Sequence, residues 1–254
     1  GFAREDHRAR HAVGVLETQG HAVLFLDAPA AGLTLDDVIA RARMHQPRLV
    51  VIDTTTPSIA ADIKTAEAIK ATLPEAVILL VGTHASALPE ATLQLSAAVD
   101  LLALREYDYT VRDVAAAVAA GSRDWSGIPG LMFRQDGKPC RTPERELTLD
   151  LDQLPMVSAV YRKHLQPEHY FNPNAKFPNV TLISGRGCPY QCTFCVYPQT
   201  MSGHRYRIRS IPNVLAELDY VLKAFPEMKE IFFEDDTLTG NKPHCRALCE
   251  AIIA

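Results

Sequence analysis

The sequence predicts an α/β fold: a doubly wound parallel sheet, followed by the start of a second series of alternating strands and helices. Over the first hundred residues, apolar runs of strand length alternate with amphipathic stretches of helical periodicity. Strands that are apolar almost throughout are typical of a parallel sheet covered by helices on both faces. A second strand–helix–strand–helix series begins at Asn179.

The first domain is predicted to alternate strand and helix to its end. The expected strands are His21–Asp27, Arg48–Asp53, Ala76–Val81 and Val99–Leu104. The expected helices are 5–19, Thr34–Met44, Ser58–Leu73, Leu88–Leu95 and Tyr109–Ala120, the last of which stops at Gly121. Because no strand precedes the first helix, we expect the sheet to lack its usual first strand.

The middle of the chain has a different character. Asp136-Gly137 separates two short extended runs within Ile128–Arg141, which is a β-hairpin signal. Residues 141–178 are rich in Pro, Asn and charge, and they predict a linker. The expected organisation is a domain at 1–121, a hairpin and linker at 122–178, and the beginning of a second domain at 179–254.

The second series is predicted from strand and capping signals. The strand Asn179–Ser184 is expected to run into a cysteine-rich loop. Ser210 is a candidate N-cap, with Pro212 just inside the helix that follows. Another strand, Glu230–Glu234, and a helix, Lys242–Ile253, complete the series.

Composition excludes several classes of protein. The 254 residues carry a net charge of −4, so there is no overall basic field to attract nucleic acid. No apolar run approaches the roughly 18 residues of a transmembrane helix, and the first ten residues lack the apolar core of a signal peptide. These observations predict a cytoplasmic protein.

Three of the six cysteines are clustered. Cys188, Cys192 and Cys195 have the spacing C-x3-C-x2-C on one short loop directly after a strand. In a reducing compartment, clustered cysteines more often bind metal or react than form disulfides. Three thiolates can hold three corners of a cubane iron–sulfur cluster and leave one iron open. A zinc site and a metal-free trio are the alternatives.

The cysteine motif resembles that of the radical S-adenosylmethionine enzymes, and Phe194 fills its aromatic position. The resemblance implies a [4Fe–4S] cluster on the three cysteines. It also implies that the open iron binds S-adenosylmethionine and cleaves it to a 5′-deoxyadenosyl radical. An electron donor such as flavodoxin or ferredoxin would reduce the cluster. The family's next strand ends in a patch that contacts the cofactor's amino group. Glu234, Asp235 and Asp236 occupy that place here. The alternative for these three residues is an exposed turn.

The first domain resembles the cobalamin-binding domain of one subgroup, which is related to anaerobic magnesium-protoporphyrin cyclase. Thr54 and Thr55 after one strand, and Gly82 after the next, match loops that face the corrinoid in that subgroup. Small hydroxyl residues and glycine permit close approach and hydrogen bonding. Plain strand-to-helix turns are the alternative. The D-x-H-x-x-G motif that supplies a cobalt-ligating histidine is absent, and His84 is predicted either to touch the corrin or to cap its loop.

Two short strings, Ala103–Thr110 and Phe232–Thr237, look like the hopanoid-biosynthesis-associated member of this subgroup. The resemblance therefore implies a hopanoid (isoprenoid) or tetrapyrrole substrate, with radical chemistry or cobalamin-dependent methyl transfer. A non-catalytic corrinoid or iron–sulfur carrier is the alternative function. No residue is assigned a catalytic role.

The family's barrel has about six strand–helix units, and only two fit after Asn179. The chain is therefore expected to be a fragment that is inactive alone. For Cys245 and Cys249, four residues apart on a helix, we expect core packing, while Cys140 after the hairpin turn is incidental. The basic run Arg205–Arg209 is expected either to meet a carboxylate or to lie in a solvated loop.

Overall fold

A computed structural model describes residues 7–254, which form two compact units. The sheet unit consists of residues 33–147 and 199–201. The cysteine unit consists of 148–198, 202–254 and the described residues of 1–32. Residues 1–6 lie outside the described residues. They include the start of the first predicted domain, at residue 1, and of the first predicted helix, at residue 5. In residues 7–254, no helix is both long enough and apolar enough to cross a bilayer.

The described residues up to Gly32 group with the cysteine unit, whereas the sequence predicts a first domain of residues 1–121. Helix α1 (His7–Thr18) packs on α7 (Val157–His164). The buried guanidinium of Arg10 lies 3.9 Å from the centroid of the Tyr161 ring, a cation–π distance. A Cβ atom on Gly14 would lie 2.8 Å from the Pro155 side chain, so glycine permits the close approach of the two segments.

The predicted strand at His21–Asp27 is wrong, because this segment forms neither a strand nor a helix. An apolar run becomes a strand only when a neighbouring segment satisfies its backbone groups, and no strand among residues 7–254 pairs with this one. Their side chains contact other segments of the cysteine unit, to which they belong. Phe25 meets the ring of His164 edge-on, and Asp27 accepts a 2.9 Å hydrogen bond from the hydroxyl of Tyr170.

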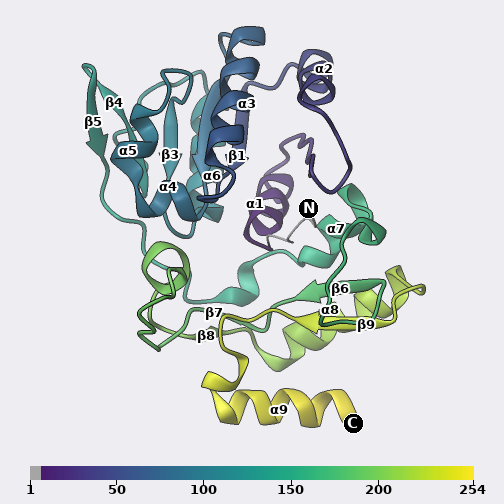
Figure 1. Cartoon of the computed structure of the whole chain (residues 1–254). Coiled ribbons are helices and arrows are strands. Elements are labelled where there is room, and N and C mark those ends of the chain that lie inside the picture. Colours follow the sequence, from purple (N-terminus) through teal and green to yellow (C-terminus); the bar gives the residue numbers. More distant parts are fainter. Residues whose placement is uncertain (1–6) are drawn as a thin grey trace. The chain divides into compact units, whose positions relative to one another are not determined.

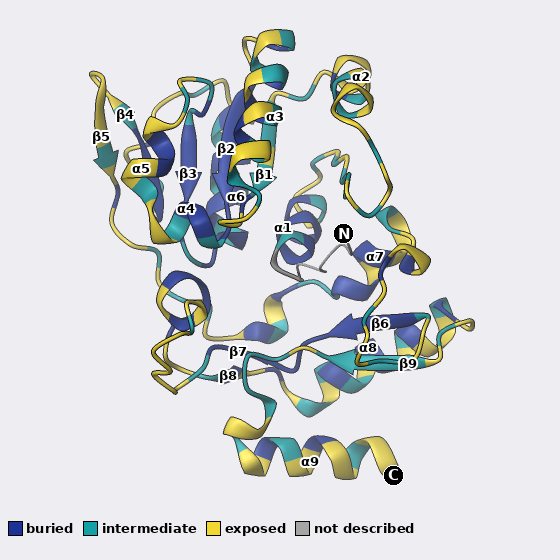
Figure 2. Ribbon diagram, in the orientation of Figure 1, coloured by how far each residue is buried: buried dark blue, intermediate teal, exposed yellow. Residues whose placement is uncertain are grey.

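The sheet unit holds a five-stranded sheet in the order β1-β2-β3-β4-β5 (Figure 1). Its strands are β1 (Leu49–Asp53), β2 (Val77–Val81), β3 (Leu101–Ala103), β4 (Leu131–Gln135) and β5 (Lys138–Arg141). The first three are parallel, and the last two are antiparallel to their neighbours. Strand β2 is buried along its whole length, which accounts for its continuous apolar sequence (Figure 2).

The predicted hairpin is confirmed, and it belongs to the sheet rather than to a separate linker. Asp136 and Gly137 both have positive φ, 51° and 75°, as a two-residue turn between strands requires. Ala103 of β3 pairs with Leu131 of β4, so the hairpin extends the sheet beyond its parallel part.

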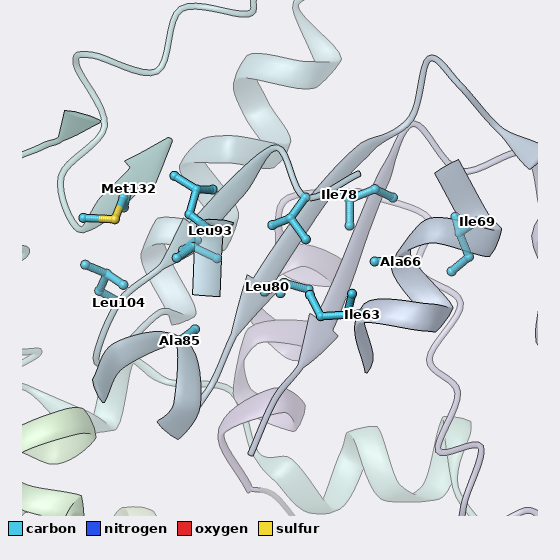
Figure 3. Packing of buried hydrophobic residues seen from close by; sticks show 11 residues of the cluster. Ile63, Ala66, Ile69, Ile78, Leu80, Ala85, Leu93, Leu104 and Met132 are labelled. Carbon is cyan, nitrogen blue, oxygen red and sulfur yellow. The ribbon is translucent and has the colours of Figure 1, made fainter. Parts of the chain in front are cut away.

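Helices cover the sheet. They are α2 (Leu35–His45), α3 (Ile59–Thr72), α4 (Thr83–Ala87), α5 (Pro89–Gln94) and α6 (Asp108–Ala119). Figure 3 shows one face of the sheet, where α3, α4 and α5 pack on alternate residues of the strands. This cluster consists of Ile63, Ala66, Ile69, Ile78, Leu80, Ala85, Leu93, Val99, Leu102, Leu104 and Met132. Helix α6 contacts β1 and ends before Gly121, which has a φ of 75°.

The cysteine unit is built on a strand–helix–strand–helix series. Strand β6 (Asn179–Leu182) pairs in parallel with β9 (Glu230–Phe233), and α8 (Ile211–Ala224) connects them. Ser210 caps α8 by accepting a hydrogen bond from the Asn213 amide, as predicted. Helix α9 (Lys242–Ile253) has its predicted bounds. The two-residue strands β7 (Gly185–Arg186) and β8 (Arg207–Ile208) pair beyond β6.

The predicted linker 141–178 is partly helical. It contains α7 and two short 3₁₀ turns, Leu151–Gln153 and Pro167–His169. Helix α7 has only eight residues, too few for a periodic pattern to stand out in the sequence. Val157 and Tyr161 are nevertheless fully buried in the core of the cysteine unit.

A buried ion pair ties this core to the end of β6. Arg209 contacts Glu217 of α8 at 2.6 Å, and both side chains are almost completely buried. Glu217 also accepts hydrogen bonds from the amide and hydroxyl of Ser158 on α7, at 3.0 and 2.8 Å. Arg209 donates to the carbonyl oxygen of Ile183, one residue beyond β6, at 2.8 Å. The pair therefore anchors the segment that leads into the cysteine loop.

Candidate metal and cofactor site

The chain turns sharply before the first clustered cysteine. Gly187 has a φ of 97°, and a Cβ atom there would lie 2.1 Å from the carbonyl oxygen of Arg205. Only glycine combines this conformation with so close an approach. The amide of Cys188 then donates to the carbonyl oxygen of Gly203 at 3.2 Å. These contacts fix where the cysteine loop starts.

The three cysteines lie on this loop beyond the carboxyl end of β6. Cys192 is exposed, and Cys188 and Cys195 are partly exposed. None of the six cysteines forms a disulfide bond. Every residue from 189 to 194 is exposed, and the Phe194 side chain is 87% exposed. In the described part of the chain, however, no three His, Cys, Asp or Glu side chains are gathered as metal ligands.

The donor set nevertheless fits a three-thiolate cluster. Three thiols on one loop match in type and number the ligands of a cubane cluster with one open iron. Residues 189–194, which include Cys192, are exposed and are therefore not fixed by packing in the core. The residue types on the loop therefore fit the ligand chemistry of such a cluster.

Asp235 follows β9 and lies beside the end of β6. It accepts hydrogen bonds from the amide of Ser184 at 3.0 Å and from its hydroxyl at 2.9 Å. It also accepts one from the hydroxyl of Tyr206 at 2.8 Å. Burial raises the pKa of Asp235, although these hydrogen bonds oppose the shift. Burial, together with the negative charge of Asp235, raises the pKa of Tyr206. Asp235 thus fastens two strand ends together.

Its two neighbours differ from it. Asp236 accepts a 2.8 Å hydrogen bond from the amide of Gly187, directly before the first cysteine. The amide of Glu234 extends the β6–β9 ladder by donating to the carbonyl oxygen of Leu182. Glu234 is exposed. The structure brings Asp235 and Asp236 to the start of the cysteine loop, so the alternative of a simple exposed turn does not describe these two residues.

Sequence reasoning missed the polar partners of Asp235. The sequence marks Ser184 only as the last residue of a predicted strand, and Tyr206 only as part of a basic run. His244 on α9 is buried, and its Nε2 lies 3.4 Å from the Ser184 hydroxyl oxygen. Burial lowers the pKa of His244. The one signal in the sequence is a serine at the end of the predicted strand, directly before the glycine turn.

The basic run has a structural role in part. Arg207 and Arg209 are buried, so the alternative of a solvated loop is wrong for them. Arg207 donates to the carbonyl oxygens of Thr148 and Ser202, at 2.7 and 2.8 Å. Arg205 is exposed.

The expectation of core packing is wrong for Cys249 of α9, which is exposed. Cys245, on the same helix, is partly exposed.

In the sheet unit, the predicted cobalamin loops lie beyond the carboxyl ends of β1 and β2. Thr54 is fully buried, and its amide and hydroxyl both donate to Val81, at 2.9 and 2.7 Å. Gly82 has a φ of 98°, and a Cβ atom there would lie 2.1 Å from a carboxylate oxygen of Asp53. Thr55 is exposed and hydrogen-bonds to Ser58. Thr54 and Gly82 thus shape the loops, while Thr55 is accessible to a ligand.

His84 fits the loop-capping alternative. Its Nδ1 lies 3.1 Å from the hydroxyl oxygen of Thr56, and its amide donates to the carbonyl oxygen of Thr54. The side chain is buried, and burial lowers its pKa. The ring therefore links the loop after β1 to the start of α4.

Comparison with known proteins finds a family match within the first half of the chain. Residues 8–115 match the B12 binding domain family. The chain is 29% identical over 222 residues to an uncharacterized methyltransferase of Pyrococcus horikoshii, covering 87% of this chain and 47% of that protein. It is 26% identical over 248 residues to the anaerobic magnesium-protoporphyrin IX monomethyl ester cyclase of Rubrivivax gelatinosus, covering 94% of this chain and 43% of the relative. The chain spans about half the length of these relatives.

A solved structure shares the fold of nearly the whole chain. It is the radical S-adenosylmethionine methyltransferase TsrM from Kitasatospora setae, with cobalamin and a [4Fe–4S] cluster bound. The TM-score is 0.76 at 16% sequence identity, and the match covers 99% of this chain and 48% of TsrM. The predicted α/β class is confirmed, and so is the relationship to the magnesium-protoporphyrin cyclases.

Proposed function

We propose that this chain, which matches the B12 binding domain family over residues 8–115 and is related to magnesium-protoporphyrin cyclases and methyltransferases, is part of a cobalamin-dependent radical S-adenosylmethionine enzyme. One observation carries the proposal. Three closely spaced cysteines start at a glycine turn whose amide is held by Asp236, at the acidic end of the neighbouring strand. The names of the relatives and of TsrM support methyl transfer or radical chemistry.

In this proposal Cys188, Cys192 and Cys195 hold three irons of a [4Fe–4S] cluster. When bound, the cluster supplies an electron to S-adenosylmethionine at its open iron. The chain's own part is to set the position of the loop: Asp236 holds the amide of Gly187, and Asp235 fixes Ser184 beside it. Phe194, which is exposed on the loop, is proposed to contact the cofactor.

The sheet unit is proposed to bind cobalamin beyond the carboxyl ends of β1 and β2, where open α/β sheets bind their ligands. The positive φ of Gly82 and the exposed hydroxyl of Thr55 support this position. Because the proposed cluster must itself receive an electron, we also propose an electron donor of the flavodoxin or ferredoxin type. The six free cysteines support a reducing, cytoplasmic location for this chemistry.

Production of 5′-deoxyadenosine by the full-length protein tests the function. The protein would be reconstituted anaerobically with iron and sulfide, reduced, and incubated with S-adenosylmethionine. Formation of 5′-deoxyadenosine, or of a methylated product with cobalamin present, is expected. Tetrapyrrole and hopanoid substrates would be compared, the first suggested by the cyclase relatives and the second by two short strings. Cluster assembly without either product would favour the carrier function.

Substituting Glu234 and Asp236 together, by Gln and Asn, is expected to weaken S-adenosylmethionine binding by about tenfold or more. We propose that Glu234 and Asp236 contact the amino group of S-adenosylmethionine, and the double variant removes both carboxylates. A hydrogen bond to a charged group contributes roughly 1.5–3 kcal/mol. Equilibrium dialysis with iron-loaded protein measures the affinity. Glu250→Gln, at an exposed site on α9, is the matched control. Unchanged affinity in the double variant, with normal iron content, would contradict this role.

Replacing His84 by alanine is expected to leave the absorption spectrum of bound cobalamin unchanged. The ring caps a loop through Thr56, and the sequence lacks the motif that supplies a cobalt-ligating histidine. The corrinoid should therefore be base-off without protein coordination. Spectra of the wild-type and variant full-length proteins, loaded with cobalamin, test this. A histidine-ligated spectrum that His84→Ala abolishes would show the assignment to be mistaken.

A further inference from the structure

An open pocket of about 590 Å³ lies beside the cysteine loop, within the cysteine unit. It is lined by residues 189–190, 204–206 and 239–243. Pockets of this volume hold small molecules. Tyr190 stands between Cys188 and Cys192 in the sequence, so the pocket adjoins the proposed cluster loop.

The charged side chains that line the pocket are all basic. Arg205, Lys242 and His204 line it, and no Asp or Glu does. Arg205 and Lys242 are exposed, and neither forms an ion pair within residues 7–254. Asp235 is not among the lining residues, and its carboxylate accepts hydrogen bonds from the hydroxyls of Tyr206 and Ser184. Two cations thus face the pocket without a neutralising partner.

The cationic wall is held in place by the same contacts that fix the cysteine loop. The backbone of Arg205 packs directly on Gly187, since a Cβ atom there would lie 2.1 Å from its carbonyl oxygen. Tyr206 is anchored through its hydroxyl to Asp235. The rings of Tyr190 and Tyr206, with Pro189 and Pro243, add flat apolar surface. The pocket therefore offers both charge recognition and a surface for an organic body.

We propose that this pocket binds a small organic molecule by its anionic group, a carboxylate or a phosphate, through Arg205 and Lys242. A guanidinium fork binds either group with two parallel hydrogen bonds, and an ammonium adds a point charge. This inference deepens the proposed function. Binding of the anion does not depend on that function, whereas the reaction that the bound molecule enters does.

Calorimetric titration of the full-length protein, reconstituted with iron and sulfide, tests the proposal. The probes are S-adenosylhomocysteine, which carries a carboxylate, 5′-methylthioadenosine, which lacks the amino-acid part, and inorganic pyrophosphate. Arg205→Gln and Lys242→Gln are compared with Arg246→Gln and Lys223→Gln, which remove exposed charges outside the pocket lining. All four changes lie at exposed positions, and circular dichroism checks folding.

Each pocket variant is expected to weaken binding of an anionic probe by about tenfold, without changing the affinity for 5′-methylthioadenosine. Loss confined to S-adenosylhomocysteine identifies a carboxylate as the bound group, and loss confined to pyrophosphate identifies a phosphate. No binding of either anion, unchanged affinities, or an equal loss in the control variants would overturn the proposal. Iron content is measured in parallel, so failure of the cluster assignment is seen separately.

Discussion

Alanine at any one of Cys188, Cys192 or Cys195 is expected to abolish the broad iron–sulfur absorbance near ~400 nm and to remove most bound iron. Each thiolate is proposed to hold one iron, and the exposed loop has no other cysteine to replace it. The measurement is absorbance and iron content of the anaerobically reconstituted full-length protein. Full iron content in all three single variants would show that the cluster is held elsewhere.

Cys249→Ala is the matched control for these variants. Cys249 belongs to the same unit and is exposed, as Cys192 is, but it lies on α9 outside the loop. Its loss is expected to leave both absorbance and iron unchanged. If Cys249→Ala lowered iron content as far as Cys192→Ala does, thiol number rather than loop position would determine loading.

Arg209→Met is expected to lower the free energy of unfolding of the cysteine unit by about 3–5 kcal/mol. The change leaves Glu217 as an uncompensated charge in the core, and breaking a buried pair has an effect of this size. It also removes the hydrogen bond to the carbonyl oxygen of Ile183. Urea denaturation followed by circular dichroism measures the loss.

The double variant Arg209→Met, Glu217→Gln isolates the effect of the charge. Glutamine is neutral and can still accept the hydrogen bonds from Ser158, so part of the lost stability should return. Fluorescence of Trp125, the single tryptophan and a residue of the sheet unit, provides a separate probe of that unit. A double variant no more stable than Arg209→Met would mean that the unpaired carboxylate is not the cause.

Local signals in the sequence predicted the elements whose stability depends on near neighbours. The turn at Asp136-Gly137, the cap at Ser210 and the stop at Gly121 depend on the conformational preferences of one or two residues. Helix α9 has the predicted bounds because its start and its periodicity are both local. The cysteine spacing is equally local, and it identified the loop on which the proposed function depends.

Three-dimensional contacts decided the rest. The run His21–Asp27 has the composition of a strand, but a strand needs a partner, and the described part of the chain supplies none. The sequence predicts the hairpin itself. It does not predict that the hairpin joins the edge of the sheet, because that depends on the pairing of Ala103 with Leu131.

For the site, the sequence determined which residues could carry the chemistry: three thiols on one loop, an acidic strand end and two small polar loops. Only the tertiary structure decided how the acidic residues divide their roles. Asp235 holds Ser184 and Tyr206, and Asp236 holds the amide of Gly187. These partners lie 29 to 51 residues away along the chain. Hydrogen bonds and buried charges depend on distance in space, so no local pattern of residues records them.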